Sequence, residues 1–404
     1  MSDDRASATR RDAIRYGGAI VGGGLLAGCA GAGESSEPTD SEAPSTAEST
    51  ATDALSETAT AESATETTTA ARGPYSVTIQ PAGQVTFPEV PETWVAENAS
   101  WADMGVALGL DKPSAVVLTG EYRTWHYEDI PGLSTAKDGT TSLWQDGISK
   151  ELLYDIDADV HFVDPNYMIN LIPDWDRADV DEIAANVGPF CGNTSFSTYP
   201  WHGDYPYYSL NEATEKVAQV FGRTDRYRAL RDLRDETTTR IRERLPLEDE
   251  RPEVALVSPG STEPEKYYPY RLGDTTAYEH WHTLGVSDAF AGSDVQSFTS
   301  DRGSIDYEAL LEIDPEVLLF YTDQYRTESE FEDTYRAYLR EHSSASQLSA
   351  VQNGAVYPAG GMYQGPISNL SKTERAARQL FPDEFGDERL YDRQRVADIR
   401  NGDL

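Results

Sequence analysis

The stretch 225–245, DRYRALRDLRDETTTRIRERL, decides how this chain is organised. Most of its other positions are charged, but one set of residues recurs at steps of three and four, the period of one helix face. Thr224 is a suitable N-cap, and Pro246 ends the run. We predict a helix of roughly 30 Å that joins two lobes. Its inward stripe is Tyr227, Leu230, Leu233 or Arg234, Thr237, Ile241 and Leu245.

Two similar segments flank this helix. Residues 153–160 (LYDIDADV) and 310–317 (LLEIDPEV) share the pattern L-x-x-I-D-x-[DE]-V, which predicts a helix end, a tight acidic turn and a buried strand. Leu-Gly pairs at 108–109 and 284–285 are both typical of a helix that ends at a glycine. We therefore predict an α/β fold with two similar Rossmann-like lobes, joined by one long backbone helix, and a ligand cleft between the lobes.

The N-terminus has the features of an exported lipoprotein. Arg10 and Arg11 form a twin-arginine pair, and the apolar run that follows, 16–27, is too short to span a bilayer. The run ends in a lipobox, residues 26–29 (LAGC), so we predict a signal peptide over 1–28 and lipidation at Cys29. Residues 29–74, rich in Ser, Thr and Glu, predict a disordered tether. This places the folded part on the extracellular face of the cell membrane.

The rest of the chain divides around the connecting helix. We expect an N-terminal α/β lobe over 75–224, the helix over 225–246, a C-terminal α/β lobe over 247–386 and a loosely packed polar tail over 387–404.

Composition limits the function classes. With 33 Lys and Arg against 70 Asp and Glu, the formal charge is −37, as in haloarchaeal-type proteins adapted to high salt. Such a surface repels nucleic acid, so we expect no nucleic-acid partner. Once Cys29 is lipidated only Cys191 remains, which excludes an intrachain disulfide. We expect a monomer.

Aromatic and cationic residues gather where strands are predicted to end. Ligands of open α/β sheets bind outside the carboxyl ends of the strands, so these residues predict a cleft with aromatic walls and guanidinium donors. Arg123 and Arg271 are the candidate charge partners of the ligand. The wall candidates are Trp101, Trp125, Tyr167, Trp201, Tyr267, Tyr270, Tyr363 and Gln364.

Four segments carry a resemblance to a known family. They are 101–110 (WADMGVALGL), 305–317 (IDYEALLEIDPEV), 351–357 (VQNGAVY) and 363–366 (YQGP). Over about 75–385 the chain resembles the substrate-binding proteins of ABC importers, of the helical-backbone class that handles iron(III)-siderophores and cobalamin. The resemblance implies a small-molecule ligand, with a ferric siderophore as the leading candidate, and docking to membrane permease and ATPase subunits. It specifies neither the exact ligand nor the contact residues. We expect no cofactor.

Other interpretations stay open. A bare metal ion would need direct ligands, and His280 and His282 are the only closely spaced histidines. Cobalamin is a further alternative within the same fold. No G-x-S-x-G, H-E-x-x-H or Walker motif occurs, so we expect no enzyme, with a lipid-anchored surface hydrolase as the remaining alternative. Of three N-glycosylation sequons, we expect that of Asn369 to be the most usable.

Overall fold

The computed structural model describes residues 73–203, 205–322 and 327–404. The twin-arginine segment, Cys29 and nearly all of the predicted tether lie outside the described residues. In the part of the chain that is described, no helix has both the length and the apolar character needed to cross a membrane.

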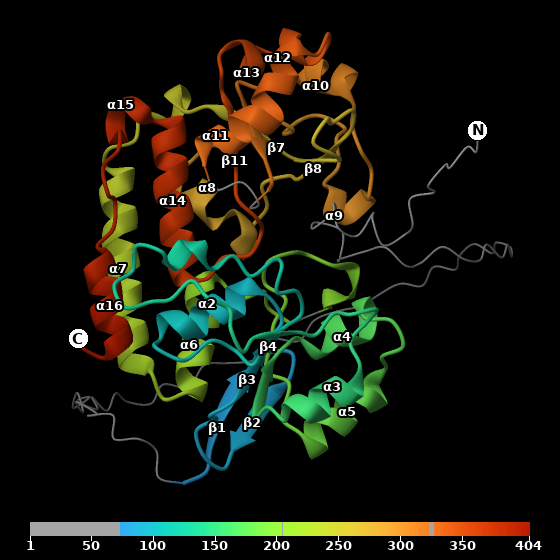
Figure 1. Cartoon of the computed structure of the whole chain (residues 1–404), viewed down its shortest axis with the longest axis vertical. Coiled ribbons are helices and arrows are strands. Elements are labelled where there is room, and N and C mark those ends of the chain that lie inside the picture. Colours follow the sequence, from blue (N-terminus) through green and yellow to red (C-terminus); the bar gives the residue numbers. More distant parts are fainter. Residues whose placement is uncertain (1–72, 204, 323–326) are drawn as a thin grey trace, which may run out of the picture.

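The first lobe is built on a parallel sheet of four strands in the order β5-β4-β3-β6 (Figure 1). An antiparallel hairpin that we did not predict precedes it, formed by β1 (Tyr75–Ile79) and β2 (Gly83–Phe87). The sheet strands are β3 (Trp94–Ala96), β4 (Ala115–Val116), β5 (Thr141–Ser142) and β6 (Val160–Phe162). The helices are α2 (Ala99–Ala107), α3 (Lys150–Ile156), α4 (Pro165–Leu171), α5 (Arg177–Asn186) and α6 (Leu210–Val220), with 3-10 turns η1 (Thr124–Tyr127) and η2 (Pro200–His202).

The second lobe repeats this plan around a mixed sheet. Its order is β11-β10-β7-β8, with β9 also paired to β7, and only β8 runs antiparallel. The strands are β7 (Glu253–Pro259), β8 (Tyr267–Pro269), β9 (Ser287–Asp288), β10 (Val317–Phe320) and β11 (Val356–Pro358). The helices are α8 (Glu279–Leu284), α9 (Phe298–Asp301), α10 (Tyr307–Ile313), α11 (Glu328–Phe331), α12 (Ala337–Glu341) and α13 (Ser349–Gln352).

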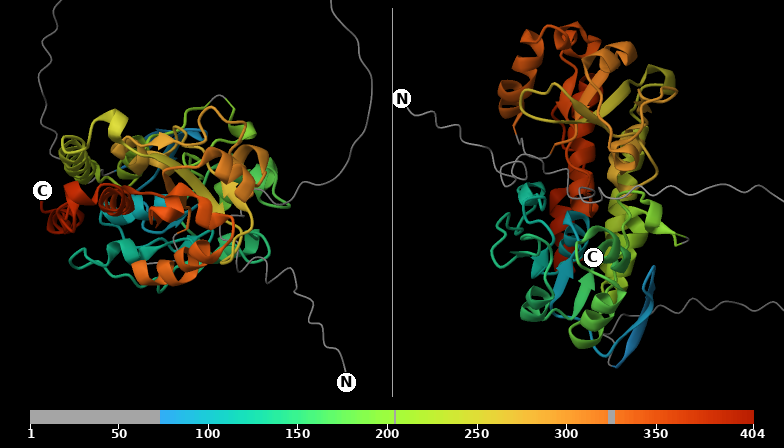
Figure 2. Two further views of the ribbon diagram at one scale, coloured as in Figure 1. Left: turned by 90° about the horizontal axis from the view of Figure 1, so that it is seen from above. Right: turned by 90° about the vertical axis from the view of Figure 1, so that its right-hand side faces the viewer.

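The predicted connecting helix is α7 (Thr224–Arg242), and it buries the predicted stripe from Tyr227 to Ile241. Leu245 lies beyond its end and is partly buried. A second long helix, α14 (Pro366–Leu380), runs beside α7 through both lobes, as Figures 1 and 2 show. We predicted α14 only from residue 372 onward, so the expectation of a single bridging helix was incomplete. Two adjacent helices make a stiffer link between the lobes than one.

The structure confirms the internal repeat, because both copies contain the same turn and the same kind of hydrogen bond. Asp157 ends α3 and Asp314 ends α10, both in the left-handed backbone region, with φ of 48° and 45°. Two residues after each of these aspartates, a carboxylate accepts a hydrogen bond from the backbone at the start of the neighbouring strand. Asp159 accepts from the backbone N–H of Thr93 at 2.8 Å, and Glu316 accepts from that of Glu253 at 3.0 Å. The two lobes therefore use the same turn to start equivalent strands.

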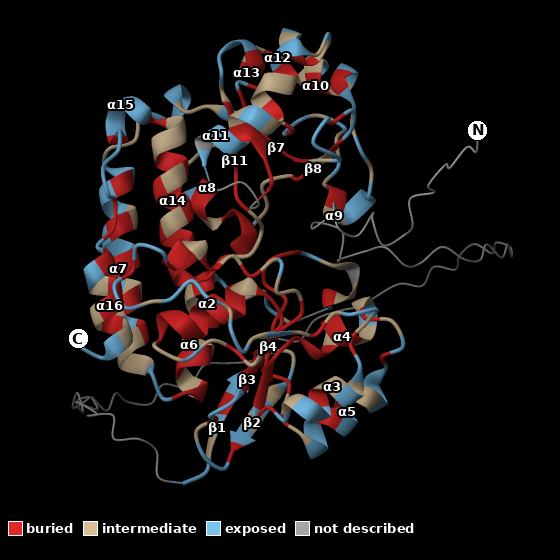
Figure 3. Ribbon diagram, in the orientation of Figure 1, coloured by how far each residue is buried: buried red, intermediate tan, exposed pale blue. Residues whose placement is uncertain are grey.

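The C-terminal tail is not loose, which corrects our expectation. After α15 (Pro382–Phe385) the chain returns to the first lobe, where α16 (Arg393–Asn401) packs on α2 and α7. Val396 and Ile399 are fully buried in the core of that lobe, and Arg400 donates to the carbonyl of Val106 at 2.6 Å. Figure 3 shows α16 as a mixture of buried and partly exposed residues. The apolar positions were too few and too close together to reveal the helix.

We predict that Ile399→Ala destabilises the protein by about 2–4 kcal/mol, because it leaves a cavity where α16 meets α2. Denaturant unfolding measures this. Leu404→Ala is the control, since Leu404 is 58% exposed and its truncation should change stability by less than about 0.5 kcal/mol. Equal small effects of both variants would contradict the packed position of α16.

Candidate functional site

The segments that follow the strands of the two lobes touch one another. Ser195, in the loop after α5, accepts from the backbone N–H of Thr276 of the second lobe at 3.1 Å. The next residue, Phe196, packs edge-on against Tyr363 with ring centroids 5.0 Å apart. Tyr363 follows β11, so the carboxyl-terminal side of both sheets faces the same interlobe space. This is where the sequence predicted a cleft.

Two buried carboxyl groups lie at the edge of the first sheet. Glu97 follows β3 and is 2% exposed, and Asp164 follows β6 and is fully buried. The backbone N–H of Asp164 donates to Glu97 Oε2 at 2.9 Å, and Tyr205 donates its hydroxyl to Asp164 Oδ2 at 2.8 Å. Within the described ranges no Lys, Arg or His forms an ion pair with either carboxyl.

This arrangement favours the neutral form of Glu97. Burial, and then the neighbouring Asp164 carboxyl, raise the pKa of Glu97 to about 8. Burial also raises the pKa of Asp164, against the lowering effect of its hydrogen bonds from Thr194 and Tyr205. We did not predict this pair, because in so acidic a chain a carboxyl residue after a strand carries no signal.

Three tyrosines are close enough to Glu97 to respond to its charge. Burial first, and then the charge of Glu97, raises the pKa of Tyr167 and Tyr199. Burial also raises the pKa of Tyr363, with smaller contributions from Tyr167, Glu121, Tyr199 and Glu97. Tyr199 also begins an aromatic column, since its ring stacks on Trp201 at 4.9 Å and Trp201 stacks on His202 at 5.6 Å. Of the predicted wall residues, Tyr167, Trp201 and Tyr363 are thus brought to one region.

Arg123 and Trp125 lie on the neighbouring side of the cleft, before and within η1. Arg123, Glu121 and Tyr363 line a cavity of about 10 Å³, the size of one water molecule. His126 lines both this cavity and a neighbouring groove of about 830 Å³, which also runs along α14. Trp125 lines the groove, and the guanidinium of Arg375 lies 5.8 Å from its ring. Of these two spaces along the described residues, the groove has the volume that small-molecule sites usually have.

Several predicted site residues lie in the cores instead. Trp101 is 1% exposed and stacks on Phe162 at 5.5 Å. Tyr267 is fully buried and donates to Tyr307, and Tyr270 packs against Tyr321. These three aromatics are explained by packing, and we leave them out of the candidate site.

Arg271 is also away from the cleft. It forms an ion pair with Asp288 at 3.2 Å. Asp288 belongs to β9, which pairs with the first residues of β7 and therefore lies at the opposite end of the sheet from the cleft. We had placed Arg271 in a loop after β7, but Tyr267–Pro269 form a strand, β8, that runs antiparallel to β7 and carries the chain away from the cleft.

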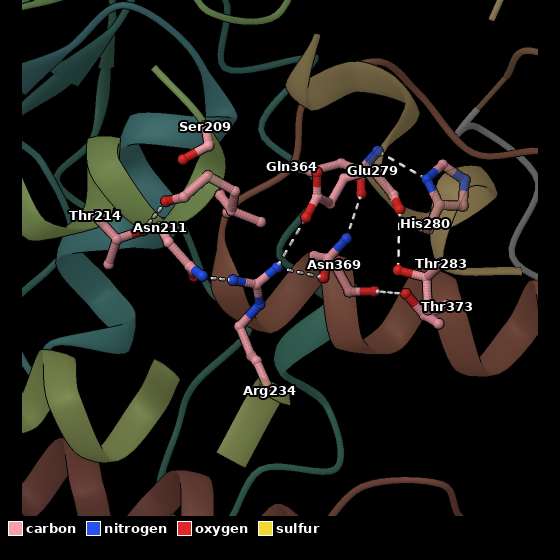
Figure 4. Close-up of polar contacts among 12 residues, drawn as sticks. Ser209, Asn211, Thr214, Arg234, Glu279, His280, Thr283, Gln364, Asn369 and Thr373 are labelled. Carbon is pink, nitrogen blue, oxygen red and sulfur yellow. Dashed lines mark hydrogen bonds and ion pairs between the residues drawn. The ribbon is translucent and has the colours of Figure 1, made fainter. Parts of the chain in front are cut away.

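Gln364 belongs to a buried polar joint between the lobes, drawn in Figure 4. Its side-chain amide donates to the carbonyl of Ala277 at 2.6 Å and lies 2.8 Å from His280 Nδ1. Its oxygen accepts from Asn369, which in turn accepts from Arg234 of α7 at 3.1 Å. Arg234 reaches the first lobe through its hydrogen bond to Asn211 of α6. We therefore infer that Gln364 holds the two lobes in position and does not contact the ligand.

Asn369 is 4% exposed, so our expectation that its sequon is usable was wrong for the folded chain.

A second contact completes the joint. Asp103 of α2 accepts from the backbone N–H and the hydroxyl of Ser368, at 2.9 and 3.0 Å, and so caps the N-terminus of α14 from the other lobe. Gly365 permits this approach, because a Cβ there would lie 2.5 Å from Asp103. The 101–110 and 363–366 segments, which carried the family resemblance, thus meet in space.

The described residues hold no group of three or more His, Cys, Asp or Glu side chains suited to a metal ion. His280 and His282 have separate partners, since His282 Nε2 lies 2.9 Å from the carbonyl of Gly273. Nothing in the described part of the chain therefore supports direct ligation of a bare metal by this pair.

A protein-family model described as periplasmic binding protein matches residues 148–361. This chain belongs to the periplasmic binding protein family. The family, of the iron(III)-siderophore and cobalamin type, comprises substrate-binding components of ABC transport. The predictions of an α/β binding-protein fold and of a protein that is not an enzyme are confirmed. No curated protein matches the chain in sequence.

Solved structures show the same fold at low identity. A periplasmic solute binding protein from Mycobacterium smegmatis is 16% identical, with a TM-score of 0.54 over 78% of this chain and 99% of that one. A periplasmic binding protein from Veillonella parvula is 14% identical, with a TM-score of 0.53 over 76% and 97%. Staphylococcus aureus SirA, complexed with staphyloferrin B, is 14% identical, with a TM-score of 0.51 over 76% and 98%.

We predict that Glu97→Gln stabilises the protein, and more so at higher pH. The pKa of Glu97 is about 8 in the folded state, above its ordinary value of 4.5, so the unfolded chain loses the proton first. The native protein therefore loses stability as the pH rises from about 4.5 to about 8, by up to about 1.4 kcal/mol per pH unit. Glutamine removes this loss.

Unfolding in denaturant at pH 5 and at pH 8.5 measures the effect. The control is Glu151→Gln, which changes an exposed carboxyl on α3 and should leave stability nearly unchanged at both pH values. A stability change for Glu97→Gln that does not depend on pH would contradict the raised pKa.

Proposed function

We propose that this protein captures an iron(III)-siderophore or a similar metal chelate between its lobes and delivers it to an ABC permease. In the same proposal it is a lipoprotein, exported by the twin-arginine route and anchored through Cys29 on the extracellular face of the membrane. The anchor and its tether keep the folded part near the permease without fixing its orientation.

The observation that carries this proposal is the convergence of aromatic and guanidinium groups on one interlobe cleft. Tyr363 lines the cavity and Trp125 lines the groove, so both offer ring faces there. Tyr167, and Trp201 through its stacking on Tyr199, belong to the aromatic layer of the first lobe beside Tyr363. Arg123 lines the cavity beside Tyr363, where its donors suit metal-bound oxygens. These five residues are the proposed site. Two solved structures with this fold point the same way: the SirA complex above and a protein of an iron(III)-hydroxamate transport system from Saccharomonospora viridis.

Closure is expected to be small. The polar joint around Gln364 and Arg234, together with two parallel helices, restricts rotation of one lobe against the other. The cavity at Tyr363 has room for only one water molecule, so part of the chelate would occupy the groove beside Trp125 and part would enter as the lobes separate slightly.

We predict saturable quenching of tryptophan fluorescence when the purified full chain is titrated with the right ferric chelate in high salt. Arg123→Ala and Trp125→Ala should each raise the Kd about tenfold or more, which corresponds to about 1.4 kcal/mol. Arg271→Ala is the matched control, since Arg271 is paired with Asp288 outside the cleft and its loss should leave the Kd unchanged.

The same titration separates the alternatives. Quenching by free iron, zinc or manganese alone would favour a bare-ion protein, and quenching by cobalamin alone would favour the corrinoid class. A Kd that responds to Arg271→Ala and not to Arg123→Ala would contradict the proposed site.

A further inference from the structure

Arg302 has a backbone conformation that arginine rarely adopts. It ends α9 with φ of 58° and ψ of 14°, and its N–H donates to the carbonyl of Phe298 at 3.1 Å. A short side chain that bonds locally to the backbone tolerates this left-handed conformation, whereas a long one does not. The other described residues with positive φ, apart from glycines, are all aspartates, namely Asp157, Asp174 and Asp314. Arg302 is therefore strained, and strain of this kind is found mainly at functional sites.

The turn after α9 does not by itself explain the arginine. The left-handed conformation costs an L-residue a factor of roughly five to thirty in the folding equilibrium, and glycine would avoid that cost. The guanidinium of the exposed Arg302 lies 5.2 Å from the ring of Phe298. An exposed cation–π contact contributes a factor of only roughly two to five, which is less than the strain. The reason for an arginine here is therefore what its side chain faces.

Arg302 faces the first lobe. In Figure 1, α9 lies on the side of the second lobe that is turned toward the first lobe, above α4. Burial and then the charge of Glu97 raise the pKa of Tyr199 to about 12, while the guanidinium of Arg302 opposes this rise. The two lobes also touch close to Tyr199, since Thr275 Oγ1 donates to the carbonyl of Phe196 at 2.9 Å. Arg302 of one lobe and Tyr199 of the other are thus on opposite walls of the interlobe space.

Tyr199 ends a column of stacked rings. Its ring stacks on Trp201 at 4.9 Å and 12°, Trp201 stacks on His202 at 5.6 Å, and His202 stacks on Tyr207 at 3.5 Å. Phe196 meets Tyr199 edge-on, at 81°, and none of the described rings stacks on the other face of Tyr199. Tyr199 is also only partly buried. A flat ring from a ligand can therefore extend the column at Tyr199, within reach of a guanidinium.

We propose that Arg302 and Tyr199 together bind an aryl arm of the ferric chelate, and that the cleft therefore selects catecholate chelates over trihydroxamates. This inference rests on the proposed function. The aryl ring stacks on Tyr199, and its anionic oxygens accept hydrogen bonds from Arg302. The iron centre then lies beside Tyr363, toward Arg123, because Tyr363 contacts Phe196 on one side and lines the Arg123 cavity on the other.

The chemistry of the chelating arms explains the selection. A catecholate is an aromatic ring with two anionic oxygens, so it gains both from stacking and from charge-assisted hydrogen bonds. A hydroxamate arm has no ring, and a ferric trihydroxamate centre is neutral. A carboxylate chelate is anionic but has no ring, so it separates the contribution of charge from that of stacking.

Three ferric complexes test the proposal in titration calorimetry of the full chain in high salt. Ferric enterobactin is an anionic triscatecholate, ferrichrome is a neutral trihydroxamate, and ferric rhizoferrin is an anionic carboxylate complex without aromatic rings. We expect the triscatecholate to bind at least tenfold more tightly than the trihydroxamate, and more tightly than the carboxylate complex.

Variants of Arg302 locate the effect. Arg302→Asn removes the guanidinium and suits the left-handed backbone. It should weaken binding of the triscatecholate at least fivefold and that of the trihydroxamate less than twofold, with a denaturant midpoint of unfolding that is unchanged or higher. Arg302→Lys, which keeps the charge without the forked donor, should weaken triscatecholate binding less than Arg302→Asn does. Asp174→Asn is the control: it changes another position of positive φ, 63°, and should leave all three affinities unchanged.

Each outcome decides a different question. Tighter binding of the trihydroxamate or the carboxylate complex would overturn this inference and leave the proposed function standing. A lower denaturant midpoint for Arg302→Asn, with equal losses of affinity for all three complexes, would show a structural role for Arg302 and would also overturn it. Failure of every ferric complex to bind would overturn the proposed function itself.

Discussion

The contact between Asp103 and the N-terminus of α14 is the constraint on which the rest of the structure depends. It places a carboxyl of the first lobe on the free N–H groups at the start of a helix that runs through both lobes. Burial raises the pKa of Asp103, and the hydrogen bonds from Ser368 oppose that rise. Because Gly365 has no side chain, the two elements approach closely enough for this geometry. A larger residue would separate the lobes and change the cleft beside them.

The cleft follows from this joint. Gln364 and Gly365 hold the start of α14 against α2, so Tyr363, the preceding residue, is held at the edge of the interlobe space. There it meets Phe196 of the first lobe and lies beside Arg123. The joint is thus polar and hydrogen-bonded, while the cavity and groove next to it are lined by the rings of Tyr363 and Trp125 and by the guanidinium of Arg123. A rigid link and the candidate site adjoin each other, as suits a protein that captures a ligand with little closure.

Much of the fold could be predicted from the sequence, and the reasons are local. The α7 stripe follows the helical period, and Asp157 and Asp314 mark equivalent turns because few residues other than Gly, Asn and Asp adopt positive φ. Less of the site could be predicted. An aromatic residue after a strand can turn inward, as Trp101 does, or outward, as Trp125 does, and only packing decides. Arg271 was misplaced because the short antiparallel strand β8 was not recognised in the segment before it, and Glu97 was missed because carboxyl residues are so frequent here.

The most direct test of the proposed site is the position of iron in a crystal of the protein grown with a ferric chelate, located by anomalous diffraction at the iron edge. We expect one strong peak in the interlobe space, between Tyr363 and the Trp125 groove, with Arg123 turned toward the metal-bound oxygens. A peak on the outer surface of either lobe, or an iron atom bound directly by histidine side chains, would contradict this site.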